Sequence, residues 1–315
     1  MEPRIFDCDK IFIDSKFFKF DWNDKNKFSE MLKQLETIKK KVKSVFYFDT
    51  TDSSGCIQNE VFDYVDLYFK SQILKNKDHY KKNFYGSRIY SDYFHKKFKV
   101  QDNLIMFQRP LTNSNLKKLK LSWNSSLANY SLKGKILMLG YKYLKNYDLL
   151  FLPKRKYIPS LTRPNLFLYK GNFKYERNTI SWQRQQIYSK MKKSLDTRRV
   201  NLIKYYNVLK KSKVVISPFG WGEINYKDYE AFIYGNLLFK PDVSHIQTWP
   251  ELFYKNKTYL QFKWDLSDFD KKIKNIRSNF EEYIHIAENG QKNYFKFLNN
   301  KSQDFVNRLI GICKE

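Results

Sequence analysis

The sequence predicts an α/β protein of two lobes that face a cleft, each with a parallel sheet covered by helices. Three observations support this fold class: apolar strand-like runs alternate with helix-like stretches, a proline-containing break divides the chain, and the alternation resumes after the break. A length of 315 residues suits two domains of ordinary size. We expect an amino-terminal α/β domain at 1–162, a ligand-binding domain at 163–290 and a helical tail at 291–315.

The first half opens with a strand, a helix and a second strand. Apolar runs at 11–13 and 44–48 flank a basic amphipathic helix at 27–41. The second strand leads into Asp49-Thr-Thr-Asp52, a polar turn where open α/β sheets place their ligand loops. Further strands are expected at 64–69, 104–107, 136–140 and 149–152.

Three prolines mark the break between the lobes. Pro153, Pro159 and Pro164 lie among basic and polar residues, which is typical of a linker. After it we expect strands at 165–169, 213–217, 236–240 and 258–262, and helices at 179–193, 199–211, 225–234 and 265–276. The tail at 280–313 reads as helical, with interruptions near Gly290 and at Asn299-Asn300.

Composition excludes a disordered chain and a membrane-spanning one. Hydrophobic residues make up 42% and aromatic residues 18%, enough for a sizeable core. The longest apolar runs are too short to span a bilayer, and the first ten residues do not read as a secretory signal. Three distant cysteines predict neither a disulfide framework nor a zinc site. We therefore expect a cytoplasmic protein.

The net charge of +27 favours anionic partners. A biased coding composition is an equally good explanation for much of this positive charge. Alanine occurs only at Ala128, Ala231 and Ala287, while lysine is spread along the whole chain. A nucleic-acid-binding protein stays an alternative, since its many Tyr and Phe side chains could stack on bases. No RNP-type motif, helix-turn-helix signature or basic arm is visible, so a specific nucleic acid is not the expected partner.

The stretch at 214–241, VVISPFGWGEINYKDYEAFIYGNLLFKP, is the most informative. A buried strand ends at Ser217, a loop with Gly220 and Gly222 follows, and a helix begins near Asn225. Glycines let the backbone approach an anionic ligand closely, and the amino terminus of a helix favours negative charge. The pattern therefore predicts that this loop binds an anion.

This stretch resembles the carboxy-terminal, nucleotide-sugar-binding domain of GT-B fold glycosyltransferases of the group-1 kind, which build bacterial surface polysaccharides. The likeness lies in Ser217-Pro-Phe-Gly-Trp-Gly-Glu223, Lys227-Asp-Tyr-Glu230-Ala, Gly235 and Lys240-Pro241. It implies two Rossmann-like lobes with carboxy-terminal helices, the first on the acceptor side. It also implies transfer of a sugar from a nucleotide-diphosphate donor to a glycan or a lipid-linked glycan, such as a lipopolysaccharide precursor.

The resemblance also assigns roles. Glu230 would accept hydrogen bonds from the ribose hydroxyls, Glu223 would lie at the donor sugar, and the amides near Gly220 and Gly222 would face the diphosphate or the sugar. The glutamate pair slightly favours retention of configuration. The commonest motif has seven residues between these glutamates, whereas six separate Glu223 from Glu230 here. A catalytically inactive partner subunit of the same fold therefore stays an alternative.

Negative charge that builds on a departing diphosphate needs cations. The preferred pair is Arg184 and Lys227, because both are expected near helix amino termini; Lys170 and Arg177 are further candidates, and each of the four could instead be a surface charge. No DxD triplet lies at a strand end and the motif needs none, so we expect catalysis without a metal or another cofactor.

Candidates for a catalytic base are His95, Asp49 and Asp52. Each has a structural alternative, because a lone histidine is commonly a satisfied structural group and an aspartate can cap a turn. His245 follows the strand that ends at the expected donor pocket, where it would touch nucleotide or sugar unless it only packs in its loop. The basic, aromatic composition further predicts peripheral contact with the anionic inner face of a membrane, where lipid-linked acceptors lie.

Overall fold

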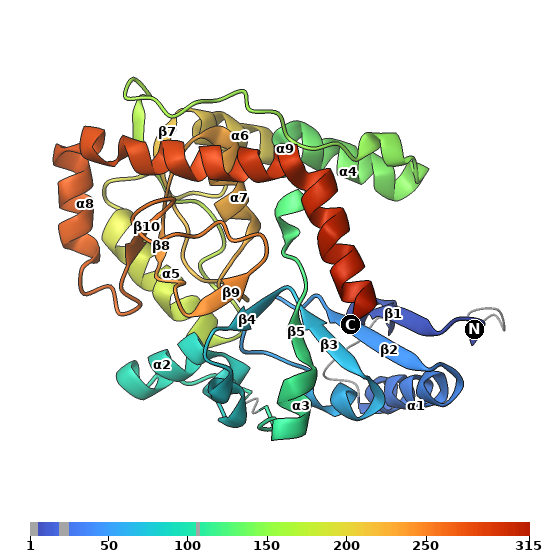
Figure 1. Cartoon of the computed structure of the whole chain (residues 1–315). Helices are drawn as coiled ribbons and strands as arrows, with labels where there is room; N and C mark the ends of the chain where they lie inside the picture. Colours follow the sequence, from blue (N-terminus) through green and yellow to red (C-terminus); the bar gives the residue numbers. More distant parts are fainter. Residues whose placement is uncertain (1–5, 19–24, 105–107) are drawn as a thin grey trace. The chain divides into compact units, whose positions relative to one another are not determined.

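The structure is a computed structural model that describes residues 6–18, 25–104 and 108–315. Two compact units emerge, each built on a parallel four-stranded sheet with helices, so the predicted α/β class is confirmed (Figure 1). Residues 125–162 belong to the second unit, whereas the sequence predicted a first domain that ends at 162. Unit 1 comprises Met1–Tyr93, Ile105–Asn124 and His245–Trp249, and unit 2 comprises Phe94–Leu104, Ser125–Ser244 and Pro250–Glu315.

Unit 1 carries the sheet β1-β2-β3-β5, in which every neighbouring pair is parallel. Stacked aromatic rings fill its core, with Phe48 and Phe69 at a centroid distance of 4.9 Å. Helix α1 buries Met31, Leu35 and Ile38 at the spacing of one helix face. Strands β4 (Gln72–Leu74) and β9 (Ile246–Thr248) of this unit pair antiparallel. Helix α2 (Ile89–Phe98) begins in unit 1 and ends in unit 2. The other strands and helices of unit 1 are β1 (Lys10–Asp14), α1 (Lys25–Lys41), β2 (Ser44–Asp49), β3 (Leu67–Lys70), α3 (Asn113–Lys118) and β5 (Leu119–Leu121).

Unit 2 carries the sheet β10-β8-β7-β6, again parallel throughout. Its central strands β7 and β8 are almost entirely buried, as expected of a parallel sheet covered on both faces. The elements are α4 (Leu132–Leu144), β6 (Asn165–Leu168), α5 (Asn178–Met191), α6 (Leu202–Lys210), β7 (Ser212–Ile216), α7 (Tyr226–Tyr234), β8 (Leu237–Pro241), β10 (Leu260–Phe262), α8 (Phe269–Ser278) and α9 (Ile284–Lys314).

Helix α7 has well-defined ends that its sequence explains. Asn225 and Asp228 form a reciprocal capping box, in which the Asn225 backbone N–H donates to the Asp228 carboxylate at 3.1 Å. Gly235 ends the helix in the left-handed region, at a φ of 65°. A Cβ at Gly235 would lie 2.8 Å from the Pro159 nitrogen, so both the backbone conformation and the space require glycine.

Several predicted elements differ in the structure. The expected strand at 136–140 is wrong, because it lies inside α4, which Ser131 caps by accepting from the Gly134 N–H at 3.1 Å. The strand expected at 149–152 is also wrong: Leu149 ends a short 3-10 turn and no strand follows it there. Short apolar runs of this kind fit either element. Most of the strand expected at 104–107 lies outside the described residues.

Helix α9 runs through Gly290 and Asn299-Asn300, so the predicted interruptions are wrong. Gly290 has a packing reason instead: an added Cβ would collide with the Thr258 carbonyl oxygen and lie 2.9 Å from the Phe232 ring. The glycine allows α9 to approach α7 closely without breaking the helix.

Candidate functional site

The candidate site lies at the carboxyl edge of the unit 2 sheet. Because parallel strands end at a common edge, the segments that follow β6 and β7 lie side by side there. These segments supply Lys170-Gly171 after β6 and the glycine loop at 217–223 after β7. The amino terminus of α7 follows the glycine loop, so its first residues reach the same place.

Arg184 of α5 holds two of these segments together. Its Nε donates to the Phe219 carbonyl at 2.5 Å and its Nη2 to the Pro218 carbonyl at 3.3 Å, while Nη1 donates to the Asn172 carbonyl at 3.2 Å. Only 7% of its surface is exposed. The side chain thereby brings a permanent positive charge to the edge of the sheet.

Two glycines make room for Arg184 and Lys227. A Cβ at Gly220 would lie 3.0 Å from Arg184 Nη2, and one at Gly171 would lie 3.2 Å from Lys227 Nζ and 3.7 Å from Arg184 Nη1. Lys227 Nζ also donates to the Lys170 carbonyl. The structure thus brings together the two cations that the sequence preferred and one of the two glycines of the 217–223 loop.

The ammonium of Lys227 is surrounded by protein, although part of its side chain reaches the surface. Burial lowers its pKa to about 8; repulsion from Arg184 adds to the shift, and Glu230 and Asp228 oppose it. A nearby anion would favour the protonated form and raise this pKa. Two neighbouring cations that donate to main-chain carbonyls are suited to bind an anionic ligand.

Glu230 lies one turn further along α7, at 2% exposure. Its Oε2 accepts from the Tyr205 hydroxyl at 2.6 Å, and its Oε1 accepts from the Tyr206 hydroxyl at 3.1 Å and pairs with Lys135 of α4. Burial and the Glu230 charge raise the pKa values of both tyrosines, so they stay protonated donors. The carboxylate is therefore already ligated by three side chains.

The glycine loop is anchored by a buried ion pair beneath it. Lys240 Nζ lies 2.5 Å from Asp228 Oδ2, both side chains are fully buried, and the same ammonium donates to the Glu223 carbonyl at 2.9 Å. Asp228 also accepts from Ser217 Oγ at 2.6 Å. Glu223 itself is buried at the end of this loop. Its main chain is thus fixed in place by Lys240.

Lys170 and Arg177 point to other partners. Lys170 Nζ donates to the carbonyls of Asp196 and Arg198 at 2.8 and 3.0 Å, which ties down the loop after α5. Arg177 Nε donates to Asp102 Oδ2 at 3.1 Å, and Asp102 also accepts from the Thr179 N–H at 2.7 Å. Both cations have these structural contacts, and the diphosphate-binding role that the sequence proposed for each stays a prediction.

His95 is the other predicted catalytic residue that lies in unit 2. Its Nδ1 lies 2.8 Å from the Val100 carbonyl oxygen, just beyond the end of α2. The contact joins the helix to the segment that follows it. The catalytic roles of His95 and Glu223 stay predictions.

Asp49, Asp52 and His245 belong to unit 1. Asp49 is buried and accepts from the Tyr68 hydroxyl at 2.6 Å and from Lys70 at 2.8 Å, so it forms an internal ion pair at the end of β2. Asp52 is exposed, and His245 precedes β9, where its carbonyl accepts from the Lys75 N–H at 2.9 Å. The sequence expected His245 beside the donor pocket, and this role stays a prediction; its segment belongs to unit 1.

Sequence reasoning missed the partners that fix the site. Tyr205 and Tyr206 were visible only as part of an expected helix, and nothing local linked them or Lys135 to Glu230. Asp228 and Lys240 lay within the motif, but their pairing across 12 residues depends on the fold of strand and helix. Asp102 lies 75 residues from Arg177 in the sequence.

The described ranges contain neither a metal-binding cluster nor a membrane-spanning helix. Among those residues, no group of three His, Cys, Asp or Glu side chains is arranged to hold a metal ion. No helix among them is both long and apolar enough to cross a bilayer. The expectation of metal-independent catalysis stays a prediction.

No protein-family model matches the chain, and no curated protein matches it by sequence. Similar solved structures include Anabaena Alr3699/HepE in complex with UDP-glucose, at a TM-score of 0.44 and 10% identity over 97% of this chain and 79% of the other. The GtfA/B complex follows at 0.42 and 12%, and the pneumococcal O-GlcNAc transferase GtfA in complex with UDP and GlcNAc at 0.38 and 9%; each covers 90% of this chain and 60% of the other.

Proposed function

We propose that the protein is a GT-B type glycosyltransferase that moves a sugar from a nucleotide-diphosphate donor to a glycan or a lipid-linked glycan. The observation that carries the proposal is the juxtaposition of Arg184 and Lys227, with Gly171 and Gly220 leaving them room at the carboxyl edge of a parallel sheet. A diphosphate is a dianion of suitable size for two cations and the amino terminus of a helix.

The arrangement of α7 supports a nucleotide rather than a simple phosphate. Lys227 and Glu230 are three residues apart, so they lie on the same face of the helix. A nucleotide whose diphosphate binds at Lys227 would present its ribose hydroxyls to Glu230. To bind, those hydroxyls replace one of the present partners of the carboxylate, Lys135, Tyr205 or Tyr206.

The reaction follows from this binding mode. The bond between the anomeric carbon and the diphosphate oxygen breaks, and the two cations stabilise the charge that develops on that oxygen. A new bond forms to an acceptor oxygen, whose proton passes to a base. Glu223, His95 and Asp52 are the residues we propose for the steps at the sugar and the acceptor, with no metal taking part.

We assign the protein to the biosynthesis of bacterial surface polysaccharide of the group-1 kind, lipopolysaccharide among them. It would act in the cytoplasm against the inner face of the membrane, where a lipid-linked acceptor is found. The net charge of +27 supports contact with an anionic surface.

A thermal-shift screen tests the proposal. The purified chain is heated with UDP, GDP, CDP, CMP and their common sugar conjugates, and a ligand that binds only the folded state raises the melting temperature. We expect one nucleotide diphosphate and its sugar conjugate to raise it clearly. Tight binding of single-stranded oligonucleotide without any shift from the nucleotides would contradict the proposal.

A further inference from the structure

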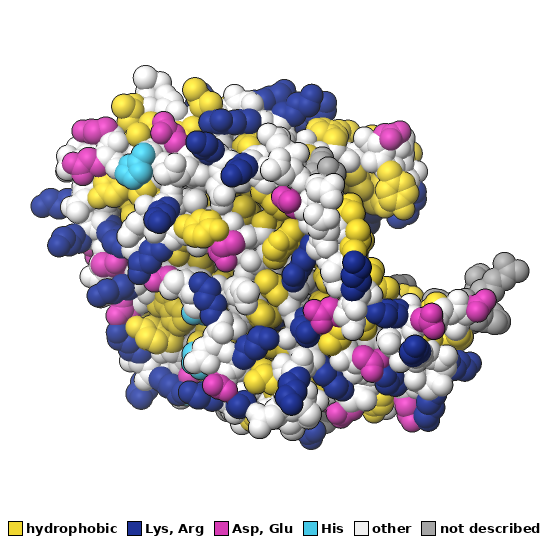
Figure 2. Space-filling model, in the orientation of Figure 1, with side chains coloured by type: hydrophobic (Ala, Val, Ile, Leu, Met, Phe, Trp, Pro, Cys, Tyr) yellow, Lys and Arg dark blue, Asp and Glu magenta, His cyan; other side chains and the backbone are white. Residues whose placement is uncertain are grey.

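Helix α4 carries an unusual exposed apolar stripe. Ile136, Leu139 and Tyr143, at positions i, i+3 and i+7, share one face and are 50%, 59% and 79% exposed. Leu144 and Tyr147 beyond them are 73% and 75% exposed. In Figure 2 hydrophobic side chains gather over the position that α4 has in Figure 1. Contiguous exposed apolar surface of this kind marks an interaction site.

Positive charge surrounds this stripe. Lys133 and Lys142 of α4 and Lys145 at its carboxyl end are exposed, whereas Lys135 pairs with Glu230. The helix contains no acidic residue, and Asp148 is the one exposed carboxylate in the segment at 147–156. The following segment at 153–156 adds Lys154, Arg155 and Lys156 in an exposed stretch. Apolar residues bordered by lysine and arginine are typical of helices that lie in the interface of a membrane.

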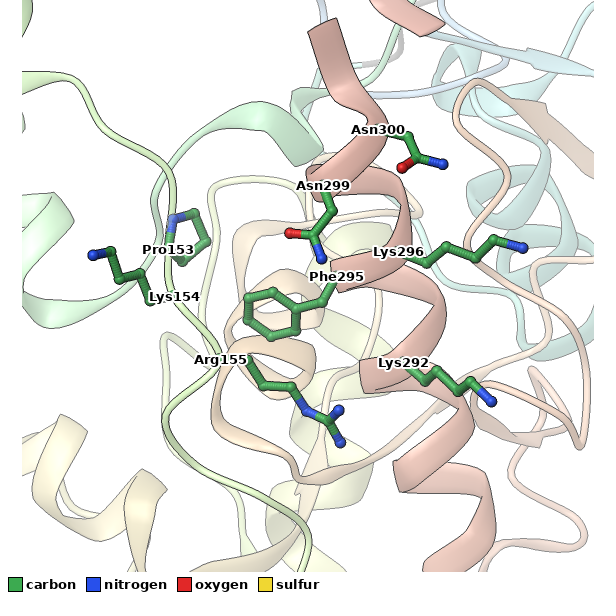
Figure 3. Close-up of a pocket in the computed structure, with 8 residues that line it drawn as sticks. All are labelled: Pro153, Lys154, Arg155, Lys292, Phe295, Lys296, Asn299 and Asn300. Carbon is green, nitrogen blue, oxygen red and sulfur yellow. The ribbon is translucent and has the colours of Figure 1, made fainter. Parts of the chain in front are cut away.

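Two cavities lie along the segment at 153–156, one of them reaching the first residues of α4, and cations line both. One, of about 500 Å³, lies between the segment at 153–155 and α9 and is lined by Lys154, Arg155, Lys292 and Lys296 (Figure 3). The second, of about 320 Å³, includes Lys133, Lys154, Lys156 and Lys210 in its lining. Among the described residues that line them, none is acidic. The cavities share Pro153 and Lys154, so they lie on either side of this segment or next to each other along it.

Figure 3 shows how the first cavity is built. Phe295 and Asn299 of α9 point toward the segment that carries Pro153, whereas Lys292 and Lys296 extend to another side of the helix. The ammonium groups of Lys154, Lys292 and Lys296 therefore do not converge on one point. Such a distribution matches many separate phosphates better than a single small anion.

We infer that this surface, formed by α4, the segment at 147–156 and the adjoining face of α9, docks on an anionic phospholipid bilayer. The apolar stripe enters the headgroup boundary, and the cations of the two cavities bind lipid phosphates. Charge complementarity selects this occupant: a second copy would bring like charges together, and a soluble anion would leave the stripe in water. With 13 residues, α4 is too short to span, so it lies in the interface.

The test is flotation of the full-length chain with vesicles of phosphatidylcholine alone or mixed with phosphatidylglycerol. Wild type should float only with the anionic vesicles, and less at high salt. The triple variant Ile136→Ser, Leu139→Ser, Tyr143→Ser should lose at least roughly tenfold in vesicle affinity. The variant Lys154→Gln, Lys292→Gln, Lys296→Gln should lose roughly 100-fold at low salt.

Matched controls remove the same kinds of group elsewhere on unit 2. Leu202→Ser with Ile203→Ser removes exposed apolar residues of α6, and Lys263→Gln, Lys271→Gln, Lys274→Gln removes three exposed charges. Both controls should float like wild type. Equal flotation of the α4 variant and wild type would overturn the inference, as would binding to neither vesicle.

Other occupants give distinct results. Self-association that the α4 variant abolishes, seen by sedimentation without vesicle binding, would assign the surface to a second copy and overturn the inference. The inference gives a surface to the membrane contact proposed above, but its failure is separable from failure of that function. A nucleotide that raises the melting temperature of wild type should raise that of the α4 variant equally.

Discussion

At the scale of single residues, the site combines the guanidinium of Arg184 with the buried ammonium of Lys227. Burial lowers the pKa of Lys227 to about 8. The Lys227 ammonium and the Arg184 guanidinium repel one another when no ligand is bound. An anion between them removes this cost, so the unliganded site is prepared for negative charge.

The lowered pKa of Lys227 predicts pH-dependent ligand binding. A nucleotide-diphosphate sugar keeps a constant charge at and above neutral pH, so the lysine is the group that changes. The affinity of the protein for the nucleotide-diphosphate sugar should fall about tenfold as the pH rises from 7 to about one unit above the Lys227 pKa of about 8. Calorimetric titration across this range checks the prediction, and Lys227→Met should bind weakly with a flat profile.

The lowered pKa of Lys227 also makes the stability of the fold depend on pH, and stability should rise with pH where ligand affinity falls. The unfolded chain binds a proton at Lys227 up to a pKa of about 10.4, above the folded value of about 8. The contribution of this residue to the free energy of unfolding therefore rises with pH between these values. A wild-type profile that shows no such rise relative to Lys227→Met would contradict the buried position of the ammonium.

The fully buried pair of Lys240 and Asp228 should be costly to break. Lys240→Met leaves the Asp228 carboxylate buried without its cation, at a cost of about 3–5 kcal/mol in the free energy of unfolding. The control is Lys255→Met, which breaks the partly exposed pair with Asp242 and should cost less than about 1 kcal/mol. Urea unfolding measures both, and similar losses would contradict this account of the pair.

At the scale of elements, the ends of α7 explain why the motif adopts this shape. The capping box orients Asp228 toward Lys240, and Gly235 turns the chain into β8. Between these ends, α7 presents Lys227 and Glu230 on one face. The glycine at the end is therefore as important to the site as the charged residues.

Alanine in place of glycine should have opposite effects on the free energy of unfolding at the end of α7 and inside α4. Gly235→Ala forces a side chain into the left-handed region and against the segment at 157–159, so it should destabilise the fold by about 2 kcal/mol or more. Gly140→Ala in α4 meets nothing closer than 3.5 Å and should stabilise by up to about 1 kcal/mol. Denaturant unfolding of both variants is the measurement. Equal effects would contradict the left-handed conformation of Gly235 and the helical position of Gly140.

Local sequence signals predicted the elements around the site well. β6, α5, β7, α7 and β8 lie within a few residues of their expected positions, because buried runs and helix caps are local features. The same reasoning failed at α4, whose short apolar run fits a strand equally well, and at Gly290, whose reason is contact with Phe232 and Thr258. The partners of Glu230 come from α4 and α6 and follow only from tertiary packing.

At the scale of the whole molecule, the net charge of +27 makes salt the best way to separate the two classes of ligand. A polyanion that neutralises many cations loses affinity steeply between about 50 and 200 mM salt, since it releases many counterions. A nucleotide sugar that meets two buried cations should lose only a fewfold. Titrations at both salt concentrations check this, and an equally steep loss for the nucleotide would point to nonspecific surface binding.

The most direct test of the central claim is calorimetric titration of the stabilising nucleotide sugar into wild type, Lys227→Met, Glu230→Gln and the exposed-lysine control Lys271→Met. Each substitution in the site removes a charge-assisted contact, so we predict losses of about 1.5–3 kcal/mol in binding free energy. The control should bind like wild type. Wild-type affinity in both Lys227→Met and Glu230→Gln would contradict a donor site at the carboxyl edge of the unit 2 sheet.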